Sequence, residues 1–370
     1  MRILVAPDKF KGSLGAAAVA QQIAEGLREV LPEAEIVQLP IADGGEGTAG
    51  VICAARGGEW HTCRVRDPLG EGVAARYCTI ADGETAVLEM SEASGLWRVS
   101  PERRDVVAAS SFGTGEMLLE ACHRGVTQII IGLGGSATND GGFGMARALG
   151  WRFADENGAL LSGYATDLLR LARLHRPAQL RLPAITAAVD VQNPLLGPRG
   201  ATASYAAQKG ATPEQMEMLE TALSQLADVV ARERGNDQRD VAGAGAAGGL
   251  GFGLLSFVSA TIRLGFEVVA EAIGLEEAVR RADVIITGEG RLDAQTLEGK
   301  APGGVAHLAK RCGKPVHAIV GELEGTPAVR DLFESISVIS RDCVTRAEAM
   351  ANGPRLLREC ARDLAATLRA

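Results

Sequence analysis

The 370-residue sequence predicts an α/β protein in which a second, mixed α/β domain is inserted into a doubly wound, parallel-sheet domain. At the start of the chain, strand-like apolar runs alternate with helical patterns over residues 3–6, 14–30, 35–40 and 46–56. The alternation returns in the C-terminal third, with strands over 283–287, 315–320 and 335–339 and helices over 303–312 and near 354–369. Between these parts the pattern changes, and the length favours two or three domains.

The middle of the chain has the features of antiparallel strands. Three short strands, joined by Pro-Leu-Gly and Ala-Asp-Gly turns, are predicted over residues 60–66, 73–80 and 85–90. A long polar helix is predicted over 213–233, and a buried strand of unassigned domain over 127–132. We therefore expect a discontinuous Rossmann- or flavodoxin-like domain of residues 1–66 and 271–370, with an inserted mixed α/β domain of residues 67–270.

The composition excludes several classes of protein. The formal net charge is −8 and aromatic residues make up 4% of the chain, so we expect neither the basic patch nor the stacking surface of a nucleic-acid-binding protein. No apolar stretch approaches the roughly 18 residues of a membrane-spanning helix. Seven cysteines are scattered without a C-x-x-C pair, which argues against a disulfide framework. We expect a cytoplasmic protein with small-molecule partners, no nucleic acid and no membrane, and its oligomeric state stays open.

Lysine is scarce in this sequence. Of the 38 basic residues only six are lysines, at positions 9, 11, 209, 300, 310 and 314. Four of the six lie in glycine-rich or polar turns, where a compact ammonium group can act as a point charge on a phosphate. An anionic small molecule bound by this acidic chain would need such a local positive site.

Five polar, glycine-rich segments follow predicted strands or helices, over residues 8–13, 41–48, 131–144, 242–253 and 286–300. In an α/β sheet, ligands bind at the carboxyl ends of the strands, where helix N-termini direct free N–H groups into one crevice. Glycines alone would indicate only tight turns. Carboxylates, amines and hydroxyls accompany the glycines in four of the five segments, which favours a binding site.

The sequence GGSATN is a candidate phosphate cradle. It offers successive backbone amides and small hydroxyl side chains, and its residues are Gly134, Gly135, Ser136, Ala137, Thr138 and Asn139. It is not a Walker A loop, because G-x-x-x-x-G-K-[ST] occurs nowhere in the chain. Two dinucleotide fingerprints occur by letter, over 132–137 and 243–248, but neither has the βαβ context that a dinucleotide site needs.

Carboxylates lie at or just beyond apolar runs, at Asp43, Glu46, Asp190, Glu289 and Asp293. Hard oxygen ligands suit a magnesium–nucleotide complex, and an acceptor alcohol needs a base. Helix capping would account for about half of such carboxylates. Arg291 and Lys300 are placed to counter negative charge.

The motifs together resemble the bacterial glycerate 2-kinase family along the whole chain. The resemblance is carried by PDKFKGS (7–13), DGGEGT (43–48), GLGGSATNDGGFG (132–144), VDVQNPLLGPRGA (189–201), QKGAT (208–212), GAGAAGGLGFG (243–253) and ITGEGRLDAQTLEGKAPGGVA (286–306). It implies ATP- and Mg²⁺-dependent phosphorylation of D-glycerate to 2-phosphoglycerate, without a P-loop, in two α/β domains with the site between them. Three positions depart from the expected pattern, namely Lys9, to which we assign no essential role, Val189 and Ala207.

The resemblance and the residue types assign roles as expectations. The expected catalytic residues are Asp190, Lys11, Lys300 and Arg291, and the expected metal ligand is Asp293. Substrate is expected at Asp8, Ser13, Asp43, Glu46 and Asn193. Nucleotide is expected at the GGSATN residues, Glu289 and Thr296. Among three candidate bases, Asp43, Asp190 and Asp293, we favour Asp190, because it ends a strand of small residues that would mount it rigidly.

Two alternative functions come from other classes. The first is an NAD-dependent hydroxy-acid dehydrogenase, which only the two dinucleotide fingerprints support. The second is a non-catalytic, two-domain protein that binds a small ligand. ADP release from ATP and glycerate would separate the kinase from both.

Overall fold

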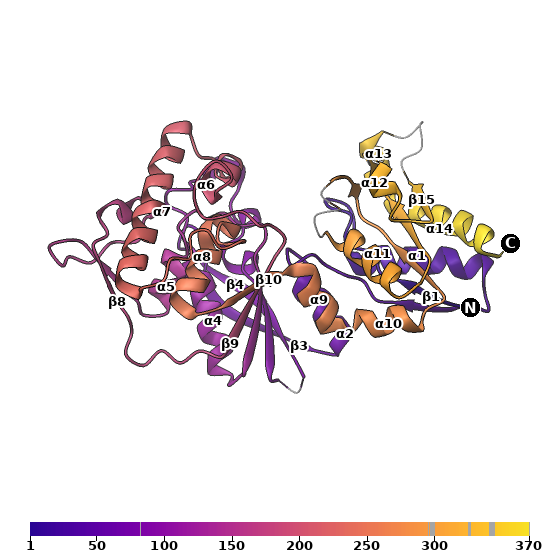
Figure 1. Cartoon of the computed structure of the whole chain (residues 1–370), viewed down its shortest axis with the longest axis horizontal. Helices are drawn as coiled ribbons and strands as arrows, with labels where there is room; N and C mark the ends of the chain where they lie inside the picture. Colours follow the sequence, from indigo (N-terminus) through magenta and orange to yellow (C-terminus); the bar gives the residue numbers. More distant parts are fainter. Residues whose placement is uncertain (82, 295, 297–299, 325–326, 340–344, 370) are drawn as a thin grey trace. The chain divides into compact units, whose positions relative to one another are not determined.

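The computed structural model describes residues 1–81, 83–294, 296, 300–324, 327–339 and 345–369. The chain forms two compact units, and Figure 1 follows it through both. The first unit comprises Met1–Asp43, Gly50–Arg56 and Phe266–Ala370, and the second comprises Gly44–Ala49 and Gly57–Gly265. Each unit contains parallel strands and helices, as the α/β class requires.

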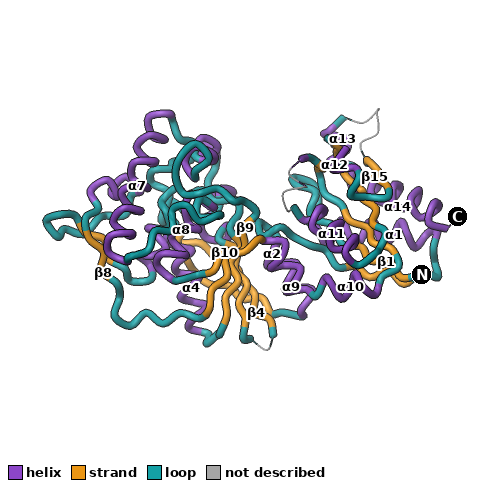
Figure 2. Tube along the Cα trace, in the orientation of Figure 1, coloured by secondary structure: helices purple, strands orange, loops and turns teal. Residues whose placement is uncertain are grey.

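The first unit is built on a five-stranded, all-parallel sheet, drawn in orange in Figure 2. Its strands in spatial order are β2 (Glu35–Gln38), β1 (Arg2–Val5), β11 (Val284–Thr287), β13 (Val316–Val320) and β15 (Ser335–Val338). Counted along this unit, the order is 2-1-3-4-5, which is the flavodoxin-like doubly wound order. The strand order therefore reverses between β1 and β11, and that position is the topological switch point of the sheet.

The helices of the first unit cover the two faces of this sheet or lie beside it. They are α1 (Ala16–Val30), α2 (Thr48–Arg56), α9 (Gly265–Ile273), α10 (Leu275–Arg281), α11 (Ala301–Arg311), α12 (Pro327–Arg330), α13 (Arg346–Ala351) and α14 (Gly353–Arg369). Helices α1 and α14 lie side by side (Figure 1) and share one core with Ile3 and Val5 of β1. Leu4 alternates to the opposite face, where α10 and α11 contact the sheet. Burial on both faces explains the apolar runs of β1 and β11, whereas the edge strands β2 and β15 are partly exposed and contain polar residues.

The second unit is built on a six-stranded mixed sheet in the order β10-β9-β6-β5-β4-β3. The strands are β3 (Glu59–Arg66), β4 (Gly72–Ile80), β5 (Thr85–Glu89), β6 (Gln128–Gly132), β9 (Ala184–Val189) and β10 (Thr261–Leu264). The pairs β3–β4 and β4–β5 are antiparallel, and β5, β6, β9 and β10 run parallel. The expected strand over 127–132 is therefore an inner strand of this sheet.

The boundary between the units differs from the expected one. Residues 57–66, expected in the first domain, belong to the second unit, because β3 pairs along its whole length with β4. Residues 266–270, expected in the inserted domain, belong to the first unit. Strand pairing between segments is a property of the fold that local periodicity does not contain.

Helices and short elements complete the two units. Those of the second unit are α3 (Ser91–Ser94), η1 (Leu96–Arg98), η2 (Pro101–Arg103), α4 (Phe112–His123), α5 (Phe143–Ala148), β7 (Arg152–Ala154), η3 (Ala165–Arg170), β8 (Arg173–His175), α6 (Ala201–Tyr205), η4 (Ala207–Lys209), α7 (Pro213–Arg234) and α8 (Ala246–Val258). The first unit adds the short pair β12 (Arg291–Leu292) and β14 (Glu322–Leu323). Among the described helices, none combines the length and the apolar composition needed to cross a bilayer.

Candidate functional site

Two acidic side chains occupy the switch point of the first unit. Asp8 follows β1 and Glu289 follows β11, and the two segments are joined where the N–H of Asp8 donates to the carbonyl of Gly288 at 2.8 Å. Gly288 has to be glycine, because a Cβ there would lie 2.0 Å from the carbonyl oxygen of Ile319. Asp8 and Glu289 are only 5% and 7% exposed. Buried carboxylates at this edge of a doubly wound sheet mark a ligand site.

Further charges gather around this pair. The Nζ of Lys9 lies 3.6 Å from Oδ1 of Asp43, and the Nζ of Lys300 lies 3.5 Å from Oδ1 of Asp293. The fully buried Thr296 donates its Oγ1 hydrogen to Oε1 of Glu289 at 3.0 Å. We call the six charged residues the switch-point cluster, namely Asp8, Lys9, Asp43, Glu289, Asp293 and Lys300.

The switch-point cluster has more acidic than basic side chains, with four carboxyl groups against two lysines. Burial raises the pKa of Asp8 to about 7, which Lys9 opposes and Asp43 reinforces. Burial likewise raises the pKa of Glu289 to about 7, against the opposing charge of Lys300. Near neutral pH each group is therefore only partly ionised. A divalent cation placed here would favour the ionised form of both carboxyl groups and so oppose the effect of burial.

These carboxylates suit magnesium that also binds phosphate. Among the described residues no group of three or more histidine, cysteine, aspartate and glutamate side chains is arranged to hold a metal by itself. Magnesium does not need such a cage, because it is usually bound through one or two carboxylates together with waters and substrate phosphates. The donor set at the switch point matches that requirement.

Three of the expected site residues lie beside the cluster and not within it. Lys11 and Ser13 are on the exposed tip of a turn closed by a bridge between Phe10 and Leu14, and Ser13 donates its hydroxyl to Met350 O at 3.0 Å. Arg291 is half exposed and ion-paired with Glu324, with its Nε 4.0 Å from Asp293. Lys9, to which we assigned no essential role, thus lies within the switch-point cluster.

The GGSATN loop follows β6 in the second unit. It shares its edge of the sheet with Glu89, which ends β5, and Asp190, which follows β9, because the strands are parallel. A Cβ on Gly134 would lie 2.8 Å from the Cα of Gly45, so the loop directly abuts the 44–49 segment. Glu46, expected to bind substrate, lies exposed in that segment.

Only the first half of the loop is accessible. Gly135 is exposed with φ of +65°, whereas Ser136, Ala137, Thr138 and Asn139 are buried. The N–H of Ala137 donates to Ser94 O at 2.9 Å. Among the described residues, the N–H groups of residues 134–136 have no hydrogen-bond acceptor. Three such consecutive amides can cradle an anion, so the cradle would rest on 134–136 and not on the side chains of Thr138 and Asn139.

A buried carboxylate holds the far end of the loop. Asp140 is 1% exposed, and its Oδ2 accepts hydrogen bonds from the N–H and hydroxyl of Ser111, both at 2.8 Å, and from the N–H of Gly144 at 3.0 Å. Its Oδ1 accepts from the N–H of Gly142 at 3.1 Å. These hydrogen bonds fix the loop to Ser111 at the start of α4 and to Gly144 of α5.

The second glycine-rich fingerprint and the residues after it pack against the backbone of residues 138–142. A Cβ on Gly248 would lie 1.9 Å from the carbonyl oxygen of Thr138, and one on Gly253 would lie 2.7 Å from the Cα of Gly142. Gly248 also has a φ of +67°, so two independent constraints require glycine there. The glycines of residues 243–253 therefore allow this segment to pack closely against the backbone of residues 138–142, and they do not form a dinucleotide-binding turn.

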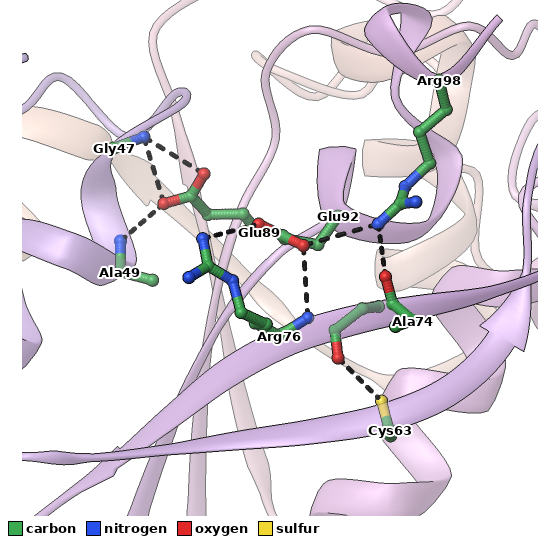
Figure 3. A network of polar contacts seen from close by, with 9 residues as sticks. Gly47, Ala49, Cys63, Ala74, Arg76, Glu89, Glu92 and Arg98 are labelled. Atoms are coloured by element: carbon green, nitrogen blue, oxygen red, sulfur yellow. Dashed lines mark hydrogen bonds and ion pairs between the residues drawn. The ribbon is translucent and has the colours of Figure 1, made fainter.

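Glu89 is a buried carboxylate at this edge of the sheet and was not among the expected site residues. Figure 3 shows its carboxylate turned toward the 44–49 segment, where it accepts from the N–H of Ala49 at 2.8 Å and from that of Gly47 at 3.1 Å. Burial raises its pKa, and the two amides oppose the rise. Glu89 therefore anchors the segment that carries Glu46 and begins α2. The available signal was an acid at the end of an otherwise apolar strand.

Asp190 and Asn193 have different surroundings. Asp190 is exposed at the carboxyl end of β9, and its charge contributes to the raised pKa of Tyr205, for which burial is the larger cause. Asn193 donates to Arg199 O at 2.6 Å and to Ser204 Oγ at 3.1 Å, and accepts from the Tyr205 hydroxyl at 2.8 Å. Its amide is therefore engaged in fixing the loop that follows Asp190.

Each unit thus presents charged or polar loops at the carboxyl ends of parallel strands. Such loops are characteristic of α/β enzymes that act on small, charged substrates. The first unit supplies carboxylates and amines, and the second supplies a glycine-rich loop with unpaired amides among its described residues.

Comparisons with known proteins give the family. The profile of the glycerate kinase family matches residues 3–369. A glycerate kinase of Halalkalibacterium halodurans is 43% identical over 98% of this chain and 97% of its own, and the glycerate 2-kinase of Escherichia coli K12 is 42% identical over 100% and 98%. A crystal structure from Salmonella typhimurium LT2, provisionally named glycerate kinase 2, has a TM-score of 0.88 at 43% identity, with 100% and 98% coverage. The chain belongs to the glycerate kinase family.

Proposed function

We propose that this protein transfers the γ-phosphoryl group of ATP to the 2-hydroxyl of D-glycerate, giving 2-phosphoglycerate and ADP. The observation that carries the proposal is the match of the whole chain to glycerate kinases, one of them named a glycerate 2-kinase. No observation favours the dehydrogenase, because residues 243–253 serve close backbone packing and the helix after the 132–137 fingerprint, α5, begins only at Phe143.

Magnesium is the proposed metal, with Asp293 as a ligand and Asp8, Asp43 and Glu289 as further candidates. When bound, it would neutralise charge on the phosphate oxygens during transfer. The chain's own part is to keep these carboxylates clustered, with Lys9 and Lys300 paired to Asp43 and Asp293. Thr296 orients the carboxylate of Glu289 through its hydrogen bond.

The GGSATN loop is the proposed contact for phosphate oxygens, through the N–H groups of Gly134, Gly135 and Ser136. Asp190 remains the proposed base for the 2-hydroxyl proton, since it is exposed on the end of a buried strand. Lys11, Arg291 and Ser13 remain proposals of lower weight, because they lie outside the switch-point cluster.

The test is ADP release with defined substrates. Purified protein with Mg²⁺, ATP and D-glycerate should release ADP, and omission of glycerate or addition of EDTA should abolish the release. L-Glycerate and lactate serve as matched acceptors that lack the correct configuration or the second hydroxyl. No ADP with D-glycerate would contradict the proposed function, and reduction of NAD by glycerate would favour the dehydrogenase.

A further inference from the structure

A lysine in the second unit is buried and has no role in the function proposed above. Lys209 is 2% exposed, whereas Lys310, in the last turn of α11, is exposed. Lysine is almost never fully buried unless it is paired, because its ammonium loses hydration. Its surroundings must therefore replace that hydration.

The partners of Lys209 are both in the GGSATN loop. Its Nζ donates to Oγ of Ser136 at 2.8 Å and to the carbonyl oxygen of Thr138 at 2.7 Å. These two bonds span the point where the loop turns from its accessible half into its buried half. The carbonyl of Thr138 is also closely approached by Gly248, so it is held on two sides.

Lys209 itself is rigidly mounted. It ends the turn η4, and its own N–H donates to Ala206 O at 3.0 Å. Gly210 follows with a φ of +97°, a conformation that favours glycine, and α7 begins with Pro213 directly after its capping residue. The ammonium is thus presented from a fixed backbone, not from a mobile surface chain.

The electrostatic surroundings of Lys209 indicate that hydrogen bonds, and not an ion pair, hold its ammonium group. Burial lowers the pKa of Lys209 to about 7, and the nearby charge of Asp140 opposes the fall. Both of its hydrogen-bond acceptors are neutral oxygens, so no contacting carboxylate neutralises it. A methionine of similar shape would avoid the desolvation cost, whereas only a donor can hold both oxygens.

We infer that Lys209 is a positioning residue that fixes residues 136–138, and thereby keeps the N–H groups of 134–136 aligned for the phosphates of ATP. The inference rests on the proposed function of the loop. Lys209 acts through the loop and not by contact with the nucleotide. Its removal should therefore weaken ATP binding and leave glycerate binding nearly unchanged.

The experiment compares Lys209→Met with the control Lys310→Met, each with Mg²⁺. ATP affinity is measured by calorimetry, and the KM values for ATP and D-glycerate are measured separately. We expect Kd and KM for ATP to rise about 10- to 100-fold in Lys209→Met, as loss of two aligned hydrogen bonds would allow. The KM for glycerate should change less than about twofold, and Lys310→Met should match the wild type.

Ser136→Ala is the second variant, because Lys209→Met could fail to fold. It removes one of the two acceptors and keeps the lysine, so ATP affinity should fall several-fold, and the Tm should fall because the buried ammonium loses an acceptor. Unchanged ATP affinity in every folded variant would overturn the inference, as would equal effects on both KM values. If the wild type binds ATP but releases no ADP with glycerate, the proposed function fails, while the affinity measurements still decide the role of Lys209.

Discussion

The carboxylate of Glu89 gives a stability prediction that can be worked out from its contacts. In Glu89→Ala, the N–H of Ala49 loses its acceptor while it stays buried, which costs about 1–3 kcal/mol. The N–H of Gly47 lies in an exposed residue and can turn to water. Loss of a negative charge at the start of α2 adds about 0.3–1 kcal/mol. We expect the free energy of unfolding of the second unit to fall by about 1–4 kcal/mol.

The variant Glu89→Gln separates the acceptor from the charge. It keeps one carbonyl oxygen for the two amides and removes only the negative charge at the start of α2, which contributes about 0.3–1 kcal/mol. We therefore expect Glu89→Gln to lie within about 1 kcal/mol of the wild type. The matched control is Glu92→Ala, whose partners Arg76 and Arg98 are unrelated to the 44–49 segment (Figure 3).

Urea unfolding followed by tryptophan fluorescence is the assay. All three tryptophans, at 60, 97 and 151, lie in the second unit, so the signal reports on that unit alone. A Glu89→Ala protein as stable as Glu92→Ala would refute the anchoring role. A Glu89→Gln protein as unstable as Glu89→Ala would show that the charge, not the acceptor, holds the segment.

Two further predictions concern carboxylates of the proposed site. Asp190→Asn should lower kcat by about 10²–10⁴-fold with ATP affinity little changed, as expected for loss of a general base. If Asp190→Asn has a near-normal kcat while Asp43→Asn or Asp293→Asn is inactive, the role of general base belongs to the residue whose variant is inactive. Because burial raises the folded-state pKa of Asp8 to about 7, stability that this group contributes at low pH is lost as the pH rises through about 7. Calorimetry in EDTA should therefore show a smaller fall in Tm between about pH 4 and 8 for Asp8→Asn than for the wild type. The same dependence of Tm on pH in both proteins would contradict this prediction.

The fold could be predicted from local periodicity where strands are buried on both faces. The runs around β1, β11 and β13 are continuously apolar and are separated by helical patterns, which is the signature of a parallel sheet. The division at residue 57 could not be predicted, because it depends on which strand β3 pairs with. Alternation in β3 indicates a strand but does not name its neighbour.

The candidate site likewise contains some residues that could be predicted from the sequence and others that could not. Asp8 and Glu289 could be predicted, because each directly follows a strand in the sequence. Glu89 and Lys209 could not, since their partners lie 40 or more residues away along the chain. Lys9 and not Lys11 lies in the switch-point cluster, because the Phe10–Leu14 bridge closes a turn whose tip, residues 11–13, is exposed. Glycines that serve backbone contact, such as Gly248, look the same in sequence as glycines that serve a ligand.

The position of the phosphoryl group on the product tests the central claim most directly. The protein is incubated with Mg²⁺, ATP and D-glycerate, and enolase is then added without a phosphoglycerate mutase. We expect enolase to consume the product at once, and the ³¹P signal of the product to be coupled to the C2 hydrogen. A product that enolase leaves untouched until a mutase is added would be 3-phosphoglycerate and would contradict the proposed function.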